Sequence, residues 1–303
     1  MKSEIRKKLL VTGVSGFLGW NVGQVAQSQW EVYGTYYTHF VQLPGVQCVP
    51  LDLTDGAALK ALFCQIQPSA VIHTAAQSSP NVCQIEPANS YEINVTASWN
   101  LAELCTEAGI PCVFTSTDLV FDGLNAPYAE TASVSPVSRY GEQKVLAESG
   151  MLARCSQVAV CRMPLMFGVP SPTSGSFIQP FLERLRSGQS LSLFMDEFRT
   201  PVSGKTAAEG LLLALEKQVR GYLHLGGRER VSRYEFGQIM AEVLEIPLTQ
   251  ITGCRQQDVK MPAPRPPDVS LDSRLARSLG YQTPSIRSEL ELFINSVNFS
   301  PKF

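Results

Sequence analysis

The sequence predicts an α/β protein built on a doubly wound parallel sheet, with a smaller and less regular C-terminal lobe. In the first half, short strand-like runs alternate with longer amphipathic segments, and the strand-like runs are apolar throughout. Strands of this kind, joined by helices, belong to parallel sheets that helices cover on both faces. After residue 165 proline and glycine become frequent, which marks the start of the second lobe.

Each element follows from its own local pattern. Strands are expected at 8–12, 31–35, 47–51, 70–74, 111–115 and 158–163, where apolar residues run together. Helices are expected between them at 18–28, 56–64, 90–108 and 139–153. In the second lobe helical patterns recur at 177–187, 207–218, 233–244 and 286–295, whereas the proline-rich stretch 261–267 is non-helical.

Composition excludes several classes of protein. The chain has 303 residues and a net charge of −2, which offers no basic footprint for nucleic acid. No apolar run approaches the roughly 20 residues of a membrane span, and the charged N-terminus does not read as a secretory signal. The eight cysteines form no Cys-x-x-Cys pair, and only three histidines are present. We therefore expect free thiols, no metal site, no nucleic-acid or membrane partner, and a cytoplasmic protein.

A glycine pattern follows the first strand directly. Gly13 suits a tight turn, Gly16 lets the backbone approach a pyrophosphate, and Gly19 lets the next helix pack closely on the strand. The start of that helix then offers unpaired N–H groups and a positive dipole to phosphate. This arrangement predicts a dinucleotide site in a Rossmann-type domain. The residues expected at the phosphates are Gly13, Ser15, Gly16, Phe17, Leu18 and Gly19.

The end of the second strand bears on which nicotinamide cofactor binds. An acidic residue there would bind the ribose 2′-hydroxyl of NAD, but residues 34–39 contain no acid and no arginine. This favours NADP, with Thr35, Tyr36 and His39 near the adenosine phosphate, and NAD stays open. Asp52, followed by Leu53, is a candidate contact to the adenine edge. A solvated turn carboxylate is the alternative for Asp52.

Tyr140 and Lys144 are four residues apart in a predicted helix, so both side chains can reach one pocket. A nearby ammonium group lowers the pKa of a phenol from its usual value of roughly 10. Such a phenol can exchange a proton in the interconversion of an alcohol and a ketone. The same spacing is also common on exposed helices that carry a solvated lysine.

Four stretches together resemble the extended short-chain dehydrogenase/reductase family, and within it the dTDP-4-dehydrorhamnose reductase branch. The stretches are 12–19, 73–76, 116–123 and 140–144. The resemblance implies that Thr117 is the hydroxyl partner of the substrate carbonyl, with Ser116 as second choice. It further implies that Tyr140 is the acid/base and that Lys144 assists it and binds the nicotinamide ribose.

The same resemblance extends the site on both sides. It adds Ala75, Ala76 and Asn94 to the cofactor region, although a purely structural role for Asn94 is an equal alternative. Residues 165–168 are expected to line the pocket wall. Arg199 and Arg265 match the arginines that related enzymes place on the substrate diphosphate, for which bidentate guanidinium binding gives the physical reason. The alternative is that both arginines are solvated or ion-paired.

Three departures from the family pattern limit the prediction. Met163-Pro164-Leu165 replaces a Thr-Ser-Trp run that faces the sugar, so dTDP-4-keto-rhamnose itself is in doubt. Cys83 replaces an aspartate three residues before Glu86. Leu119 replaces the glutamate with which sugar-nucleotide dehydratases eliminate water, so a dehydratase is excluded.

We therefore predict an NAD(P)-binding Rossmann domain at 1–165 and a substrate-binding lobe at 166–303, partly interleaved with the first. The predicted activity is NAD(P)H-dependent reduction of a 4-keto nucleotide sugar, with Tyr140 as proton donor. A nucleotide-sugar epimerase is one alternative. A non-catalytic, NADP-binding regulatory subunit, resembling that of methionine adenosyltransferase, is another. A homodimer is compatible with each of them.

Overall fold

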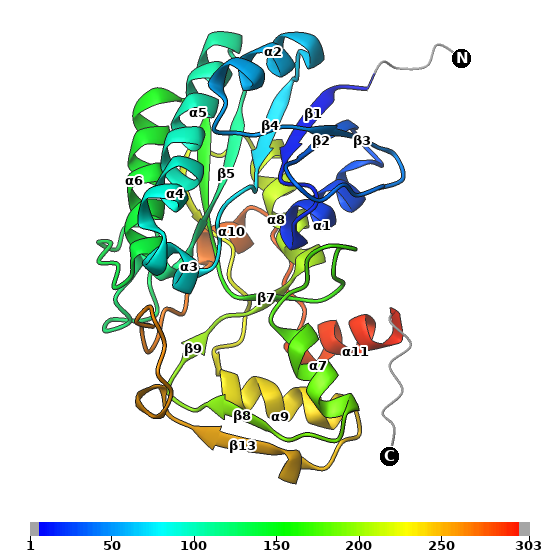
Figure 1. Cartoon of the computed structure of the whole chain (residues 1–303), viewed down its shortest axis with the longest axis vertical. Coiled ribbons are helices and arrows are strands. Elements are labelled where there is room, and N and C mark those ends of the chain that lie inside the picture. The colour runs from blue at the N-terminus through cyan, green and yellow to red at the C-terminus, as the bar shows by residue number, and fades with distance from the viewer. Residues whose placement is uncertain (1–5, 297–303) are drawn as a thin grey trace.

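A seven-stranded parallel sheet forms the centre of the computed structural model, which describes residues 6–296 (Figure 1). Its strand order is β11-β6-β5-β4-β1-β2-β3, so the chain runs outward from β1 in both directions. This doubly wound topology confirms the predicted fold class. The strands are β1 (Lys8–Thr12), β2 (Glu31–Tyr36), β3 (Val46–Pro50), β4 (Ala70–His73), β5 (Cys112–Thr117), β6 (Val158–Met163) and β11 (Gly221–His224).

Helices cover both faces of this sheet (Figure 1). Successive residues of a strand point to opposite faces, so Leu9 and Val11 pack against α1 and α8, whereas Leu10 packs against α2, α5 and α6. Burial on both faces is the reason that the strands are apolar throughout. The helices are α1 (Phe17–Ala26), α8 (Gly204–Glu216), α2 (Gly56–Ile66), α5 (Ala97–Ala108) and α6 (Arg139–Arg154).

The predicted helix at 90–108 begins earlier and is not regular. It consists of α4 (Pro87–Tyr91), a π-helical turn (Glu92–Thr96) and α5, and α3 (Pro80–Ile85) precedes it. Single π-turns are rare and occur often at functional sites. Here the turn carries Asn94, whose environment is described below.

The second lobe has its own apolar core, formed by residues of α7, α9, α11 and the three short strands β7, β8 and β13 (Figure 1). Its elements are β7 (Met166–Phe167), α7 (Ile178–Arg186), β8 (Leu191–Phe194), β9 (Phe198–Arg199), β10 (Val202–Ser203), β12 (Val231–Ser232), α9 (Arg233–Val243), β13 (Ile251–Cys254) and α11 (Ile286–Ser296). The short helix α10 (Arg274–Ser278) instead packs on the first lobe, where Ala276 joins the core beside β11. Between β10 and β12 the chain returns to the first lobe as α8 and β11. Within residues 6–296, no helix is long and apolar enough to cross a bilayer.

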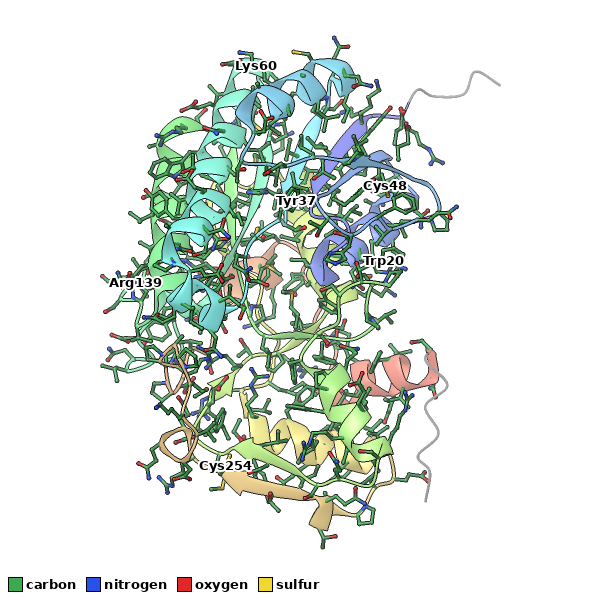
Figure 2. All side chains as sticks on the ribbon, in the orientation of Figure 1. Trp20, Tyr37, Cys48, Lys60, Arg139 and Cys254 are labelled. Atoms are coloured by element: carbon green, nitrogen blue, oxygen red, sulfur yellow. The ribbon has the colours of Figure 1, made fainter. Side chains whose placement is uncertain are left out.

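Arg139, the first residue of α6, lies at the end of that helix which faces the second lobe (Figure 2). The Ser138 hydroxyl caps the helix there by accepting a hydrogen bond from the Gly141 N–H. A Cβ atom on Gly141 would lie 2.3 Å from the Leu119 carbonyl oxygen, so only glycine allows this close approach. The contact fixes the first turn of α6 against the segment that follows β5.

Candidate active site

A cavity of about 810 Å³ opens at the carboxyl ends of the central strands. Ligands of open parallel α/β sheets bind at this edge. Its lining includes most of the residues that the sequence predicts for a dinucleotide site. These are Gly13, Ser15, Gly16, Phe17, Leu18, Gly19, Thr35, Tyr36, His39, Asp52, Leu53, Ala75, Ala76, Ser116, Tyr140 and Lys144.

The glycine loop has the geometry of an anion site. Gly13 adopts a φ of +74°, and a Cβ atom on it would lie 2.8 Å from the Ala75 Cα atom. Gly16 is the N-cap of α1, and the first turn contains no acidic residue. The unpaired N–H groups of that turn therefore face the cavity without a competing carboxylate.

A segment of the second lobe crosses the glycine loop. The Ser171 and Thr173 hydroxyls both donate hydrogen bonds to the Ser15 carbonyl oxygen, at 2.7 and 2.9 Å. Residues 173–176 line the cavity beside the loop. Sequence reasoning missed this segment, because a polar stretch without periodicity gives no signal of what it contacts.

The adenosine end of the cavity is lined by residues 35–39 and 51–54. The Thr35 side chain is buried and its hydroxyl accepts a hydrogen bond from the Gly13 N–H at 3.3 Å, so it supports the loop from beneath. The Asp52 carboxylate accepts hydrogen bonds from the Thr54 N–H and hydroxyl at 2.9 and 2.7 Å. Tyr37, which the prediction did not include, also lines this end and is 67% exposed.

Tyr140, Lys144 and Ser116 meet at the other end of the cavity. All three side chains are buried, and the Ser116 Oγ atom has no hydrogen-bond partner among the described residues. The Thr117 hydroxyl is engaged instead, because it donates to Asp118 Oδ1 at 3.2 Å and accepts from the Leu119 N–H. Of the two predicted hydroxyls, Ser116 is therefore the one without a hydrogen-bond partner among the described residues.

Burial has the largest effect on the pKa values of Tyr140 and Lys144. It raises the pKa of Tyr140 above its ordinary value, and the hydrogen bond with Thr117 only partly opposes this. The lowered phenol pKa expected from a nearby lysine is therefore not found. Burial also lowers the pKa of Lys144 to about 7, against the opposing effect of Glu148. A protonated phenol in this position is the form that can donate a proton.

Asn94 lies behind the cavity wall and does not line it. Its side-chain amide accepts from the Gln77 N–H at 2.9 Å and donates to the Gln77 carbonyl at 3.1 Å. It also donates to Gln143 Oε1 of α6 at 2.9 Å. Asn94 thus ties the wall segment after β4 to the helix that carries Tyr140 and Lys144, and its predicted link to the cofactor is indirect.

The two predicted substrate arginines lie outside the cavity lining. The Arg199 guanidinium is buried, 3.5 Å from Asp118 Oδ2 and 3.3 Å from Glu197 Oε1. Burial raises the pKa of Asp118 to about 6, although Arg199 opposes the shift. Arg265 is half-buried and donates to Asn81 Oδ1 at 3.1 Å. Arg199 is thus ion-paired, which is the alternative that its sequence left open.

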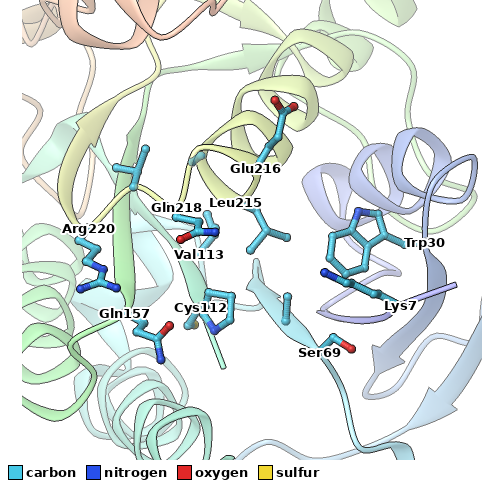
Figure 3. Close-up of a pocket in the computed structure, with 14 residues that line it drawn as sticks. Lys7, Trp30, Ser69, Cys112, Val113, Gln157, Leu215, Glu216, Gln218 and Arg220 are labelled. Carbon is cyan, nitrogen blue, oxygen red and sulfur yellow. The ribbon is translucent and has the colours of Figure 1, made fainter. Parts of the chain in front are cut away.

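A smaller cavity, of about 360 Å³, lies at the opposite edge of the sheet (Figure 3). It is formed where β4 and β5 begin, beside the end of α8, and Trp30, Gln157 and Arg220 line it. None of the predicted site residues belongs to its lining. The chemistry-bearing residues therefore gather at the carboxyl edge.

Parallel strands, a glycine turn and a cavity at the carboxyl edge define a Rossmann-type nucleotide-binding protein. The chain belongs to the family described as RmlD substrate binding domain, which matches residues 7–299. This confirms the family that the sequence motifs indicated.

Three known proteins illustrate the range of that family. Methionine adenosyltransferase 2 subunit beta of Xenopus laevis is 31% identical over 287 residues, which cover 92% of this chain and 84% of the relative. A Haloferax volcanii protein named "Probable low-salt glycan biosynthesis reductase Agl14" is 30% identical over 288 residues. The aligned region covers 92% of this chain and 95% of that protein. The structure of a dTDP-4-dehydrorhamnose reductase from Clostridium acetobutylicum aligns with a TM-score of 0.83 at 25% identity, over 96% of this chain and all of that one.

Proposed function

We propose that this protein is an NADPH-dependent reductase of a 4-keto nucleotide sugar. The observation that carries the proposal is the meeting of Tyr140, Lys144 and Ser116, whose hydroxyl has no partner among the described residues, in one cavity with the glycine loop. The glycine loop, the uncapped start of α1 and the hydroxyls of residues 173–176 fit a dinucleotide diphosphate. When bound, the nicotinamide cofactor supplies a hydride to the carbonyl carbon.

Residues of this chain then bind and protonate the oxygen of that carbonyl. Ser116 donates a hydrogen bond to it, and Tyr140 transfers its phenolic proton as negative charge develops on the oxygen. Lys144 holds the ribose hydroxyls and its positive charge stabilises the phenolate left after transfer. Thr117 orients the Tyr140 phenol, with which it shares a hydrogen bond.

We propose NADP rather than NAD, because no carboxylate stands at the end of β2 to accept a hydrogen bond from a ribose 2′-hydroxyl. We assign the diphosphate of the sugar nucleotide to Arg265, whose guanidinium hydrogen-bonds, among the described residues, the neutral oxygens of Asn81 and Ala263. Arg199 is committed to two carboxylates and serves to hold the wall of the sugar pocket.

The test is a panel of 4-keto sugars on dTDP, UDP and GDP, each incubated with the purified protein and NADPH. We expect one of them to drive NADPH oxidation and to yield a reduced sugar by mass spectrometry. Conversion of a sugar nucleotide to its epimer without net NADPH consumption would instead identify an epimerase.

A second candidate is a cofactor-binding regulatory subunit. The observation in its favour is the similarity to methionine adenosyltransferase 2 subunit beta over 92% of this chain. Tight NADPH binding without turnover on the whole panel, together with a change in the activity of a methionine adenosyltransferase on mixing, would support this function over the reductase.

A further inference from the structure

Three ionisable residues of α6, Tyr140, Lys144 and Glu148, follow one another at intervals of four. They therefore lie on one face of the helix, about one turn apart. Lys144 and Glu148 are each 1% exposed. The proposed reaction uses Tyr140 and Lys144 but gives no role to the carboxylate one turn further along.

Arg162 of β6 holds the Glu148 carboxylate in a two-point ion pair. Its Nη2 and Nε atoms lie 2.8 and 3.0 Å from Glu148 Oε2 and Oε1. Its Nη1 atom lies 3.4 Å from His224 Nε2. Burial lowers the pKa of His224 to about 4, so its ring is neutral, with Nδ1–H assigned as donor to the Tyr128 carbonyl and Nε2 as acceptor from Arg162.

Aromatic rings fix the guanidinium as well. The Arg162 guanidinium carbon lies 4.2 Å from the centroid of the Tyr222 ring and 5.1 Å from that of Phe121. A buried charged pair is expensive unless its hydrogen-bonding groups are satisfied. Here two strands and a helix supply partners for both members, so the carboxylate is held in one place.

Within residues 6–296, the other groups that act on Lys144 are neutral at pH 7. Cys83 of α3 is a buried thiol whose pKa is raised, so it is neutral at pH 7. His73 of β4 is also neutral, because burial lowers its pKa to about 3. Tyr140 is a protonated phenol. Glu148 is the carboxylate that acts on Lys144, and it raises the Lys144 pKa against the effect of burial.

We propose that the buried Glu148–Arg162 pair is a positioning element that favours the charged form of the Lys144 side chain inside the protein. Glu148 acts on Lys144 directly, and Arg162 acts by holding the Glu148 carboxylate in place. The consequence for catalysis rests on the proposed reductase function, but the effect on Lys144 does not. It can be measured on the protein alone.

The direct measurement is an NMR titration of the protein labelled with ¹³C at the lysine Cε atoms. The Lys144 signal is assigned as the one that Lys144→Arg removes. In Glu148→Gln the carboxylate is lost, and we expect the midpoint of the Lys144 titration to move to lower pH by about one unit or more. Glu148→Gln also leaves Arg162 unpaired and can fail to fold. The double variant Glu148→Leu/Arg162→Met replaces the whole pair by apolar groups, which buried pairs often tolerate.

Glu103→Gln is the matched control. It breaks an exposed ion pair at the far end of α6, where Glu103 meets Arg154 at 3.0 Å, and should leave the Lys144 titration unchanged. Once a substrate is found, the alkaline limb of the rate profile should shift by the same amount as the NMR titration. A folded Glu148 variant with an unshifted Lys144 midpoint would overturn the inference, even if its activity were lost. A shifted midpoint in a protein without turnover would count only against the reductase function.

Discussion

The Lys144 ammonium nitrogen lies 4.1 Å from the centroid of the Phe114 ring of β5. A cation over an aromatic face is stabilised by about 1–2 kcal/mol when water is excluded. Phe114 therefore works in the same direction as Glu148, against the burial that lowers the pKa of Lys144. The sheet beneath α6 thus places an aromatic ring against the Lys144 ammonium.

Replacing this ring should make Lys144 easier to deprotonate. In Phe114→Leu we expect the Lys144 titration midpoint to fall by about one unit, since one pKa unit corresponds to roughly 1.4 kcal/mol. Phe63→Leu, in the same core but on α2, is the control for lost packing. Both variants should lose stability, by on the order of 1 kcal/mol. Equal Lys144 titration midpoints in the two variants would contradict the stabilisation of the ammonium by the Phe114 ring.

A second prediction concerns the first turn of α6. Replacing glycine by alanine inside a helix normally stabilises it by roughly 0.5–1 kcal/mol. In Gly141→Ala, however, the new Cβ would lie 2.3 Å from the Leu119 carbonyl oxygen, so the turn must move and carry Tyr140 with it. We expect a fall in the rate of the chemical step of about 100-fold, with weaker effects on NADPH binding.

Gly56→Ala provides the comparison for Gly141→Ala. Gly56 begins α2, and the nearest atom to its new Cβ lies 3.6 Å away, so rate and binding should both stay as in the wild type. Single-turnover kinetics and NADPH fluorescence titration measure the two quantities separately. Equal rates in the two alanine variants would refute the role assigned to the Gly141 contact.

Stability should fall as the solution becomes acidic. Burial holds the pKa of His73 at about 3 and that of His224 at about 4, both below the ordinary value of 6.5. Between pH 6.5 and 4 the unfolded chain binds protons that the folded chain does not, so the free energy of unfolding decreases as the pH falls. Asp118, with its pKa raised to about 6, and Glu289, whose pKa burial also raises, act in the opposite sense. The lowered pKa values of Asp122, Glu197 and Asp272 act in the same sense as the histidines.

Urea denaturation at pH 7 and pH 4.5 tests this sign. Each histidine should contribute about 2–3 kcal/mol to the difference. His224→Asn should reduce the difference, since asparagine does not titrate. An unfolding free energy that is equal or greater at pH 4.5 would contradict the burial of two neutral histidines.

Cofactor choice can be altered at the adenosine end of the cavity. Tyr37 is exposed and lines that end one residue after β2. Tyr37→Asp places a carboxylate where it repels a 2′-phosphate and can accept a hydrogen bond from a 2′-hydroxyl. The ratio of NADH to NADPH affinity should rise by about tenfold or more, which corresponds to 1.4 kcal/mol. Tyr37→Asn, neutral and similar in size, should leave the ratio close to that of the wild type.

Local patterns in the sequence predict most of the first lobe. β1 and β6 have the predicted bounds, because a fully buried strand is a continuous apolar run. The glycine loop is equally predictable, since its residues are close together in the sequence and directly follow β1. β11 was not predicted: it has four residues, and it becomes a strand only through pairing with β6.

The remainder of the site depends on contacts between distant segments. Residues 173–176 reach the cavity because Ser171 and Thr173 bind the Ser15 carbonyl, over a separation of more than 150 residues. Arg199 is a phosphate-binding candidate by sequence, yet Asp118 and Glu197 surround it in space. Tyr140 was expected to have a lowered pKa, whereas its burial raises the value. The spacing of residues along the sequence shows neither how deeply a side chain is buried nor which groups it contacts.

The central claim is that Tyr140 supplies the proton when a hydride reaches a sugar carbonyl in this cavity. The most direct measurement uses NADPH carrying deuterium at the transferred position, the substrate found in the panel, and mass spectrometry of the sugar product. Wild-type protein should place one deuterium on the product carbon. Tyr140→Phe should bind NADPH normally but form product at least 100-fold more slowly. Undiminished deuterium transfer in Tyr140→Phe would contradict the account.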